Sequence, residues 1–321
     1  MASLTLTMSA DSPLLALLYD GTVRLKDVDL QIQQIAPQER HDRMAHNLEF
    51  DICEYSSINY LSGFDGGLQF TAIPTFPHRI FRHRDIWVSV ASGIETPRQL
   101  TGGRVGIQSW ANSAALWQRG ALQQDFGVDL RTIDWVGNIP EEQKYDLPDW
   151  LRLRRRPRDT SLEDMLLAGE LDCIMVPWPS RFPPEKQGQV RRLFPDYVAA
   201  EQQYFARHCA FPIMHLVVIK NDVLAEHPWV AQSAYEGIKR AMDTYVRQQR
   251  AANAPSPVWH DLCWSEQEDR LGLNPWESGV VENHPVLQTA VTYAYEQGVI
   301  ARPMVPQELF QREGQPLVAA G

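Results

Sequence analysis

The fold is decided by residues 102–138, which read GGRVGIQSWANSAALWQRGALQQDFGVDLRTIDWVGN. A turn at Gly102 and Gly103 leads into a β-prone run, and a helix is then expected from about Asn112 to Gln124. The strand Thr132–Val136 follows this helix. Because strand and helix alternate, the stretch predicts a mainly parallel sheet with helices on its faces.

The same alternation continues on both sides. Apolar spacing and turn signals predict strands at Leu4–Met8, Asp172–Val176 and His215–Ile219, and helices at Pro37–Asn47, from Thr160, at Pro228–Gln249 and at Pro285–Gln297. The basic run Arg152–Arg158 is expected to be a solvated loop, with an anion site as the alternative. The sequence thus predicts an α/β protein, in which ligands bind at the carboxyl ends of strands.

Composition limits the classes of partner. The chain has 321 residues, enough for two domains, and its 44% hydrophobic and 22% charged residues are typical of a globular protein with a core. The formal net charge is −10, so a phosphate backbone is repelled and no nucleic-acid partner is expected. An anionic ligand therefore requires a local cluster of positive side chains.

The sequence also bears on location. No basic residue precedes Arg24, and no stretch approaches the roughly 18 apolar residues of a membrane span. We therefore expect neither a secretory signal nor a membrane partner. The four cysteines lie far apart and predict buried thiols in a reducing compartment: Cys53, Cys173, Cys209 and Cys263. Together these features predict a cytoplasmic protein.

The densest polar cluster is Phe76–Arg84, which contains Arg79, Arg82 and His83. An arginine offers a planar fork to a carboxylate, and a histidine can move a proton near neutral pH. Solvated cations on a surface hairpin would give the same composition, so both interpretations stay open at this point.

Three smaller clusters also contain candidate site residues. Glu54 and Ser56 follow a short buried strand, Trp110 and Ser113 precede a helix whose N-terminus can hold a carboxylate, and His215 stands among apolar residues. The alternatives are ordinary helix caps for the serines and a core position for the histidine.

Familiar catalytic motifs are absent from the sequence. There is no GxGxxG, Walker loop, GxSxG or HExxH, and histidines and carboxylates show no metal-ligand spacing. From the residues alone we predict a two-lobed α/β protein that binds a small anion.

In combination, these segments resemble the 4,5-dihydroxyphthalate decarboxylase family, a cytosolic offshoot of the type 2 periplasmic-binding-protein fold. The resemblance extends from about Leu4 to Phe310. It is carried by Asp51-Ile52-Cys53-Glu54-Tyr55-Ser56, Ala72-Ile73-Pro74-Thr75-Phe76-Pro77-His78-Arg79-Ile80-Phe81-Arg82-His83, Ala114-Ala115-Leu116-Trp117-Gln118-Arg119-Gly120, Arg192-Leu193-Phe194-Pro195-Asp196-Tyr197 and Phe211-Pro212-Ile213-Met214-His215.

The resemblance implies a discontinuous first lobe, residues 1–90 and 217–321, a second lobe, residues 91–216, and a ligand cleft between them. It also implies cofactor-independent decarboxylation of a small hydroxylated aromatic carboxylic acid by a carbon–carbon lyase of aromatic-compound catabolism, such as phthalate degradation. The expected catalytic residues are His83, His215 and Glu54. The expected substrate-binding residues are Arg79, Arg82, Ser56, Ser113 and Trp110.

The chain departs from the family pattern in two places. An Asp-Arg-Thr-Arg-like stretch is replaced around Leu14 and Ala16, and a Tyr-Gly-x-Glu-x-Asn-Arg pattern becomes Ser278-Gly279-Val280-Val281-Glu282-Asn283-His284. Both departures remove positive charge that would hold one of two carboxylates. We therefore expect this chain to share the family's reaction class, decarboxylation, and to act on a substrate that can differ from 4,5-dihydroxyphthalate.

Two other functions are kept as alternatives. One is a non-catalytic cytosolic solute-binding protein for an aromatic or other small anionic ligand, since most of the wider superfamily only binds. The other is a metal-assisted lyase, in which Glu54, His83 and His215 converge on a divalent ion. In the main prediction the enzyme uses no metal and no cofactor, and its only required partner is a small anionic aromatic substrate. A homo-oligomer is compatible with this prediction.

Overall fold

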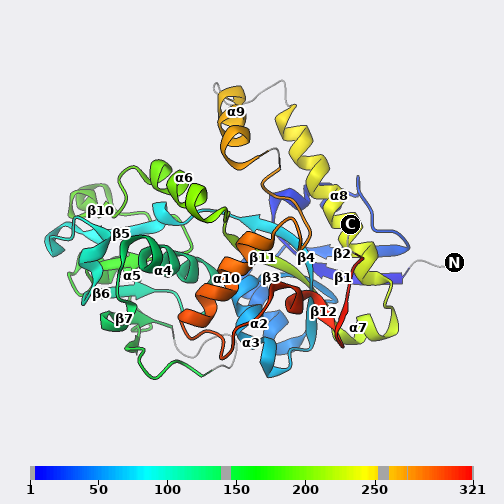
Figure 1. The fold of residues 1–321 in the computed structure, drawn as a ribbon, viewed down its shortest axis with the longest axis horizontal. Helices are drawn as coiled ribbons and strands as arrows, with labels where there is room; N and C mark the ends of the chain where they lie inside the picture. The colour runs from blue at the N-terminus through cyan, green and yellow to red at the C-terminus, as the bar shows by residue number, and fades with distance from the viewer. Residues whose placement is uncertain (1–3, 139–145, 252–259, 273, 320–321) are drawn as a thin grey trace. The chain divides into compact units, whose positions relative to one another are not determined.

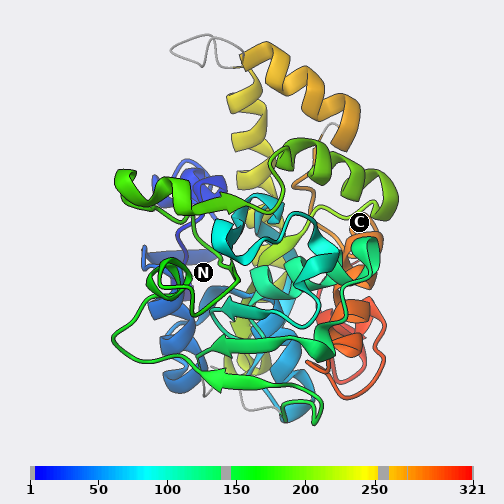
Figure 2. The same cartoon turned by 90° about the vertical axis from the view of Figure 1, so that its left-hand side faces the viewer.

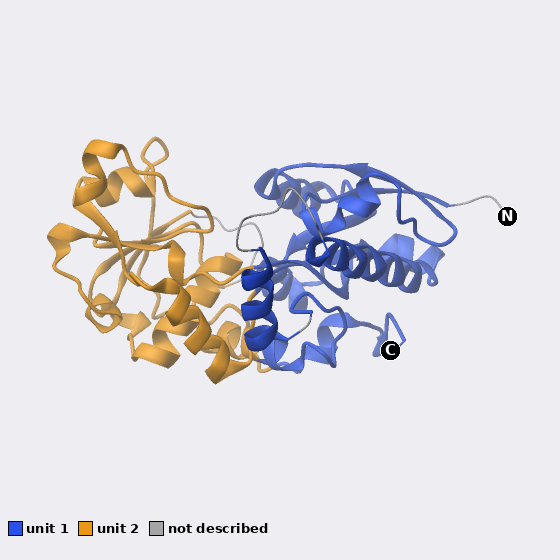
Figure 3. Ribbon diagram, turned by 90° about the horizontal axis from the view of Figure 1, so that it is seen from above, with its two compact units in different colours: residues 1–79, 213–288, 304–321 blue, residues 80–212, 289–303 orange. Residues whose placement is uncertain are grey.

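The structure is a computed structural model that describes residues 4–138, 146–251, 260–272 and 274–319. The chain forms two compact units (Figure 3): unit 1 contains residues 1–79, 213–288 and 304–321, and unit 2 contains residues 80–212 and 289–303. The unit boundaries differ from the expected 90/91 and 216/217. Residues 86–89 form a strand of the unit 2 sheet, residues 213–216 begin a strand of the unit 1 sheet, and residues 289–303 return to unit 2. The predicted ligand cleft stays a prediction.

Unit 1 is built on a five-stranded sheet (Figure 1). Its strands are β1 (Leu4–Ser9), β2 (Val28–Gln33), β3 (Ile52–Ser56), β4 (Phe70–Arg79) and β11 (Ile213–Lys220), in the order β2-β1-β3-β11-β4. β1 is parallel to β2 and β3, whereas β11 is antiparallel to both of its neighbours, β3 and β4. Four strands therefore share one direction, and the reversed strand β11 lies between two of them.

The helices of unit 1 are α1 (Ala16–Tyr19), α2 (Pro37–Asn47), α3 (Ser57–Gly63), α7 (Asn221–Glu226), α8 (Val230–Arg250) and α9 (His260–Leu271). α9 has no buried residue, so it does not pack on the sheet. The apolar side of α8, including Ala234, Ile238 and Met242, packs in one buried cluster with Val217 and Ile219 of β11. The burial of this apolar surface is the main source of stability for unit 1.

Unit 2 contains a six-stranded sheet. Its strands are β5 (Ile86–Ser89), β6 (Arg104–Ile107), β7 (Asp134–Gly137), β8 (Leu153–Arg155), β9 (Cys173–Met175) and β10 (Val190–Arg192), in the order β10-β5-β9-β6-β7-β8. β9, β6, β7 and β8 are mutually parallel, and β5 is antiparallel to β9 and β10. The helices are α4 (Ser113–Phe126), α5 (Leu162–Leu167) and α6 (Tyr197–His208), and Leu162, Met165 and Leu166 of α5 pack against Val136 and Ile174.

The remaining elements are at the end of the chain. Helix α10 (His284–Glu296) begins in unit 1 and ends in unit 2, and the short hairpin β12 (Gln311–Arg312) and β13 (Gln315–Pro316) belongs to unit 1. α9 follows the C-terminal end of α8 (Figures 1 and 2), where Glu268 of α9 forms an ion pair with Arg250 at 2.6 Å. Within the described residues, no helix combines the length and the apolar character that a membrane span requires.

Most of the sequence-predicted elements are present, and the α/β class is confirmed. α2 has the predicted bounds, with Pro37 as its first residue, where a missing N–H costs nothing. Two predictions are wrong. Residues 153–155 form the edge strand β8, paired with β7, instead of a loop. Cys209 and Cys263 are exposed, and only Cys53 and Cys173 are buried.

Candidate functional site

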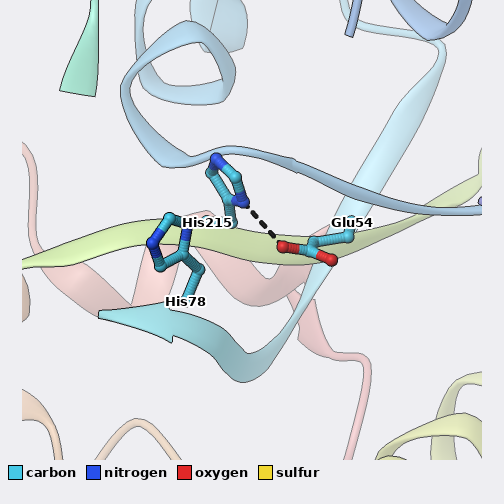
Figure 4. Close-up of side chains that lie close together, drawn as sticks. All are labelled: Glu54, His78 and His215. Carbon is cyan, nitrogen blue, oxygen red and sulfur yellow. Dashed lines mark hydrogen bonds and ion pairs between the residues drawn. The ribbon is translucent and has the colours of Figure 1, made fainter. Parts of the chain in front are cut away.

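The strand pairing of β11 brings three site residues together. His215 of β11 lies opposite Ser56 of β3 on one side and opposite His78 of β4 on the other. Glu54 pairs with Val217, two positions further along β11, so its side chain is on the same face as that of His215. Figure 4 shows Glu54, His78 and His215 pointing toward one another from these three strands. The cluster lies at the carboxyl end of β3, the edge at which the sequence predicts a ligand.

An irregular stretch of β4 places His78 in this cluster. His215 pairs with His78 and Val217 pairs with Ile73, so residues 74–77 of β4 face only one residue of β11. Pro74 and Pro77 lie in this stretch, where their missing N–H groups remove no ladder hydrogen bond. The β-bulge therefore turns His78 toward His215.

Glu54 is a fully buried carboxylate whose two oxygens both accept hydrogen bonds. Oε1 lies 2.6 Å from Nδ1 of His215, and Oε2 accepts from the backbone N–H groups of Asp11 at 3.0 Å and Ser12 at 3.1 Å. Burial alone would raise the pKa of Glu54, but the hydrogen bond with His215 and the charge of Arg40 hold that pKa well below its usual range. An ionised carboxylate has no proton to give, so Nδ1–H of His215 is the donor.

Arg40, on α2, lies beside Glu54 and binds the backbone and side chains around it. Its side chain is fully buried, lies 3.6 Å from Oε1 of Glu54, and donates to Asp11 Oδ1 at 2.8 Å, to the carbonyl of Ile35 at 2.7 Å and to the carbonyl of Glu54 at 2.7 Å. Sequence reasoning missed Arg40. Its position in the predicted helix at residues 37–47 was known from the sequence. Which side of that helix packs on the strand that carries Glu54 depends on tertiary contacts, so the contact between Arg40 and Glu54 could not be predicted.

Two further histidines surround His215. The ring of His78 lies 4.6 Å from that of His215, and the ring of His41 lies 5.0 Å from it, both in edge-to-face orientation. His41 is buried and also contacts Tyr55; burial holds the pKa of His41 well below its usual value, so His41 is neutral at pH 7. His78 is half-buried and is the most open member of the cluster that it forms with Glu54 and His215.

The same three side chains are the residues to test for metal binding. Among the described residues, one ligand atom from each of Glu54, His78 and His215 lies within 4.8 Å of the others. Glu54, however, already accepts three protein hydrogen bonds, and the positive charge of Arg40 lies beside it. In this arrangement the donor set fits a divalent cation poorly, because a cation would have to displace His215 from the carboxylate.

Two other predicted residues of unit 1 have clear structural contacts. Arg79 donates to the carbonyl of Glu277 at 3.0 Å and to Asn283 Oδ1, and its guanidinium lies over the ring of Phe76. Burial lowers the pKa of Arg79 to about 9, which leaves it charged at neutral pH. Ser56 caps α3 by accepting from the N–H of Asn59, the alternative that the sequence left open.

The other four predicted residues belong to unit 2. Arg82 forms an ion pair with Asp85 at 3.0 Å. His83 is buried between the rings of Phe194 and Tyr204, and burial lowers the pKa of His83 to about 4.

The remaining two are Trp110 and Ser113. The indole of Trp110 is buried, with the guanidinium of Arg119 3.7 Å from its ring centre and its N–H donated to the carbonyl of Gln297. Ser113 begins α4, which is capped by Asn112. Trp110 thus has a structural function in unit 2, and contact of either residue with a ligand stays a prediction.

Unit 1 also contains a cavity of about 450 Å³ lined by none of the predicted site residues. Pro74, Tyr235, Glu282, Phe310 and Leu317 are part of its lining. None of the described residues that line it is a lysine, arginine or histidine, so this lining is not suited to an anionic acid.

The comparisons with known proteins agree with the sequence motifs. The chain is 29% identical over 304 residues to a 4,5-dihydroxyphthalate decarboxylase from Comamonas testosteroni, a match that covers 91% of this chain and 92% of that protein. It is 32% identical over 167 residues to a 4,5-dihydroxyphthalate decarboxylase from Pseudomonas putida, covering 50% of this chain and 65% of that protein. The predicted resemblance to this family is confirmed. No family model matches the chain.

Both relatives are named decarboxylases, and decarboxylases are carbon–carbon lyases. The names of these relatives therefore confirm the predicted enzyme class. Among solved structures, the alkanesulfonate-binding protein from Xanthomonas axonopodis pv. citri bound to MOPS matches with a TM-score of 0.52 and 12% identity. The match covers 100% of this chain and 99% of that protein. It confirms the periplasmic-binding-protein-like fold.

Proposed function

We propose that this chain decarboxylates a small hydroxylated aromatic carboxylic acid without a cofactor. The observation that carries the proposal is the similarity to a 4,5-dihydroxyphthalate decarboxylase over 91% of the chain. The buried Glu54–His215 pair supports it, because a histidine held by a carboxylate is a common acid–base device.

The reaction needs proton transfer at two atoms. Loss of CO2 from an aromatic ring would leave an aryl carbanion, so the ring carbon must be protonated before the carbon–carbon bond breaks. An ionised hydroxyl para to the carboxylate pushes electron density onto that carbon and makes protonation feasible. The site therefore requires a base near the phenolic oxygen, an acid near the ring carbon and positive charge near the carboxylate.

The resemblance implies that Glu54 is catalytic, and its contacts support a positioning role. Because both oxygens of Glu54 accept protein hydrogen bonds, we propose that it holds His215, and that His215 is the base that takes the phenolic proton. For the carboxylate we propose Arg79 and Arg82. In the described part of the chain, Arg79 has no ion-pair partner within 4.0 Å, so its charge can offset that of a substrate carboxylate.

A panel assay tests the proposal. The protein is incubated with hydroxylated benzoates and phthalates, and CO2 release is followed together with ligand binding. We expect saturable release from at least one acid that carries a hydroxyl para to a carboxylate. Saturable binding without any release would support the solute-binding alternative instead, which the fold match keeps open.

Variants and chelation complete the test. Glu54→Gln and His215→Gln are expected to lower CO2 release by about 100-fold or more, the usual contribution of a general acid or base. His83→Gln tests the other histidine that the resemblance implies to be catalytic. Release that is abolished by a chelator and restored by a divalent cation would replace the cofactor-free scheme with the metal-assisted lyase.

A further inference from the structure

Decarboxylation imposes a proton balance on the site. An aryl carboxylate and one proton give an arene and CO2, so each turnover places one new hydrogen on the ring carbon. The phenolic proton is removed and later returned, whereas the hydrogen on carbon is consumed from solvent. The group that donates it must therefore be reloaded by water after each turnover.

The three clustered side chains differ in solvent exposure, and therefore in how readily water can return a proton to them. Glu54 is fully buried and His215 is 8% exposed, and the Nδ1–H of His215 is donated to Glu54. His78 is the half-buried member of the group, and one of its ring nitrogens lies within 4.8 Å of a ligand atom of both partners. His78 therefore combines access from outside with contact to the buried pair.

The strand geometry fixes this arrangement in the main chain. His78 is the cross-strand neighbour of His215, and the β-bulge at residues 74–77 sets that pairing. The edge-to-face contact of the two rings, with centres 4.6 Å apart, limits the orientations open to His78. A donor held in this way needs little reorganisation before it transfers its proton.

We propose that His78, which lies in the Ala72–His83 motif but was not among the expected catalytic residues, is the catalytic residue that protonates the ring carbon, and that the Glu54–His215 pair positions it. The inference rests on the proposed decarboxylation. An N–H bond of His78 breaks and a C–H bond forms at the carbon that bears the carboxylate. The carbon–carbon bond then breaks, its electron pair returns to the ring, CO2 leaves, and water restores the proton on His78.

The two histidines predicted earlier fit this step less well. Burial lowers the pKa of His83 to about 4, so His83 is neutral at pH 7, and its ring is enclosed by Phe194 and Tyr204. His215 is committed to Glu54 through Nδ1. His215 is better placed to act on the phenolic oxygen and to hold the ring of His78.

The test compares His78→Gln with His46→Gln, a matched control on the exposed side of α2. In the His78 variant we expect kcat for CO2 release to fall by about 100-fold or more while KM changes less than about threefold, because the group acts in the transition state. In D2O, exchange of the ring hydrogen of the decarboxylated product should fall by the same factor, since the reverse step uses the same group. The control should match the wild type in all three measurements.

A measurement on the unmodified protein covers the case in which the variant does not fold. Acylation of histidines with diethyl pyrocarbonate, mapped by mass spectrometry, should remove activity in step with modification of His78, and a bound hydroxybenzoate should protect it. Normal turnover or exchange in His78→Gln, or activity loss that follows another histidine, would overturn the inference alone. If the wild type releases CO2 from no acid, the proposed function fails and this inference fails with it.

Discussion

Replacing Arg40 with methionine tests how much its positive charge and hydrogen bonds stabilise the buried Glu54 carboxylate. The change removes three hydrogen bonds, all between 2.7 and 2.8 Å, and the cation that lies 3.6 Å from Glu54. The carboxylate stays buried, and among the described residues its remaining donors are His215 and two backbone N–H groups. Breaking a buried ion pair from one side costs about 3–5 kcal/mol, so we expect a loss of unfolding free energy of that size in unit 1.

Urea titrations followed by far-ultraviolet circular dichroism measure this loss, with Arg43→Met as the matched control. Arg43 lies on the same helix but pairs with Glu39 and Glu49 at the surface, where ion pairs contribute little. The folded-state pKa of Glu54 is lowered, so its stabilisation is complete above the ordinary glutamate pKa of about 4.3 and is lost as pH falls below it. The gap between wild type and Arg40→Met should therefore be largest at pH 7 and shrink below about pH 4. Equal losses in both variants, or a gap independent of pH, would refute this reasoning.

Three further changes test packing and burial. Burial lowers the pKa of His41, so below about pH 6.5 the unfolded chain binds a proton that the folded protein does not bind. The unfolding free energy should therefore fall as pH drops through that value. Urea midpoints at several pH values should show a smaller fall in His41→Phe. The buried hydroxyl of Thr75 has no hydrogen-bond partner within the described ranges, so Thr75→Val should raise the unfolding free energy by about 1 kcal/mol in urea titrations. A Cβ on Gly120 would come within 2.0 Å of the ring of Tyr293, so Gly120→Ala should cost about 1–3 kcal/mol in thermal unfolding, and Gly188→Ala, with open space around it, should cost little.

The alternation of strands and helices could be predicted because it is a local property of the sequence. α2 and α10 are found within one residue of the predicted bounds, since proline and turn signals mark their ends. β8 was not predicted, because its arginine-rich sequence lacks an apolar face and the strand exists through its pairing with β7. The exposure of Cys209 and Cys263 likewise depends on tertiary packing rather than on local sequence.

The candidate site was predicted only in part for a related reason. Glu54 and His215 lie beside apolar, strand-forming residues, and the family resemblance made them catalytic candidates; the structure brings them into contact. Assigning His78 to the cluster requires the β-bulge of β4, since a regular strand would place a different residue opposite His215. Arg40 and His41 are ordinary polar residues of an amphipathic helix until that helix is docked on the sheet.

The position of β11 between β3 and β4 has a consequence for synthesis of the chain. β3 and β4 are complete when the ribosome has translated residue 79, but the strand that joins them begins at Ile213. At about 5–20 residues per second, on the order of 10 s passes before β11 is made. During that interval the nascent chain presents two strands without their partner, so unit 1 is expected to depend on chaperones or on early folding of residues 80–212 for protection against aggregation.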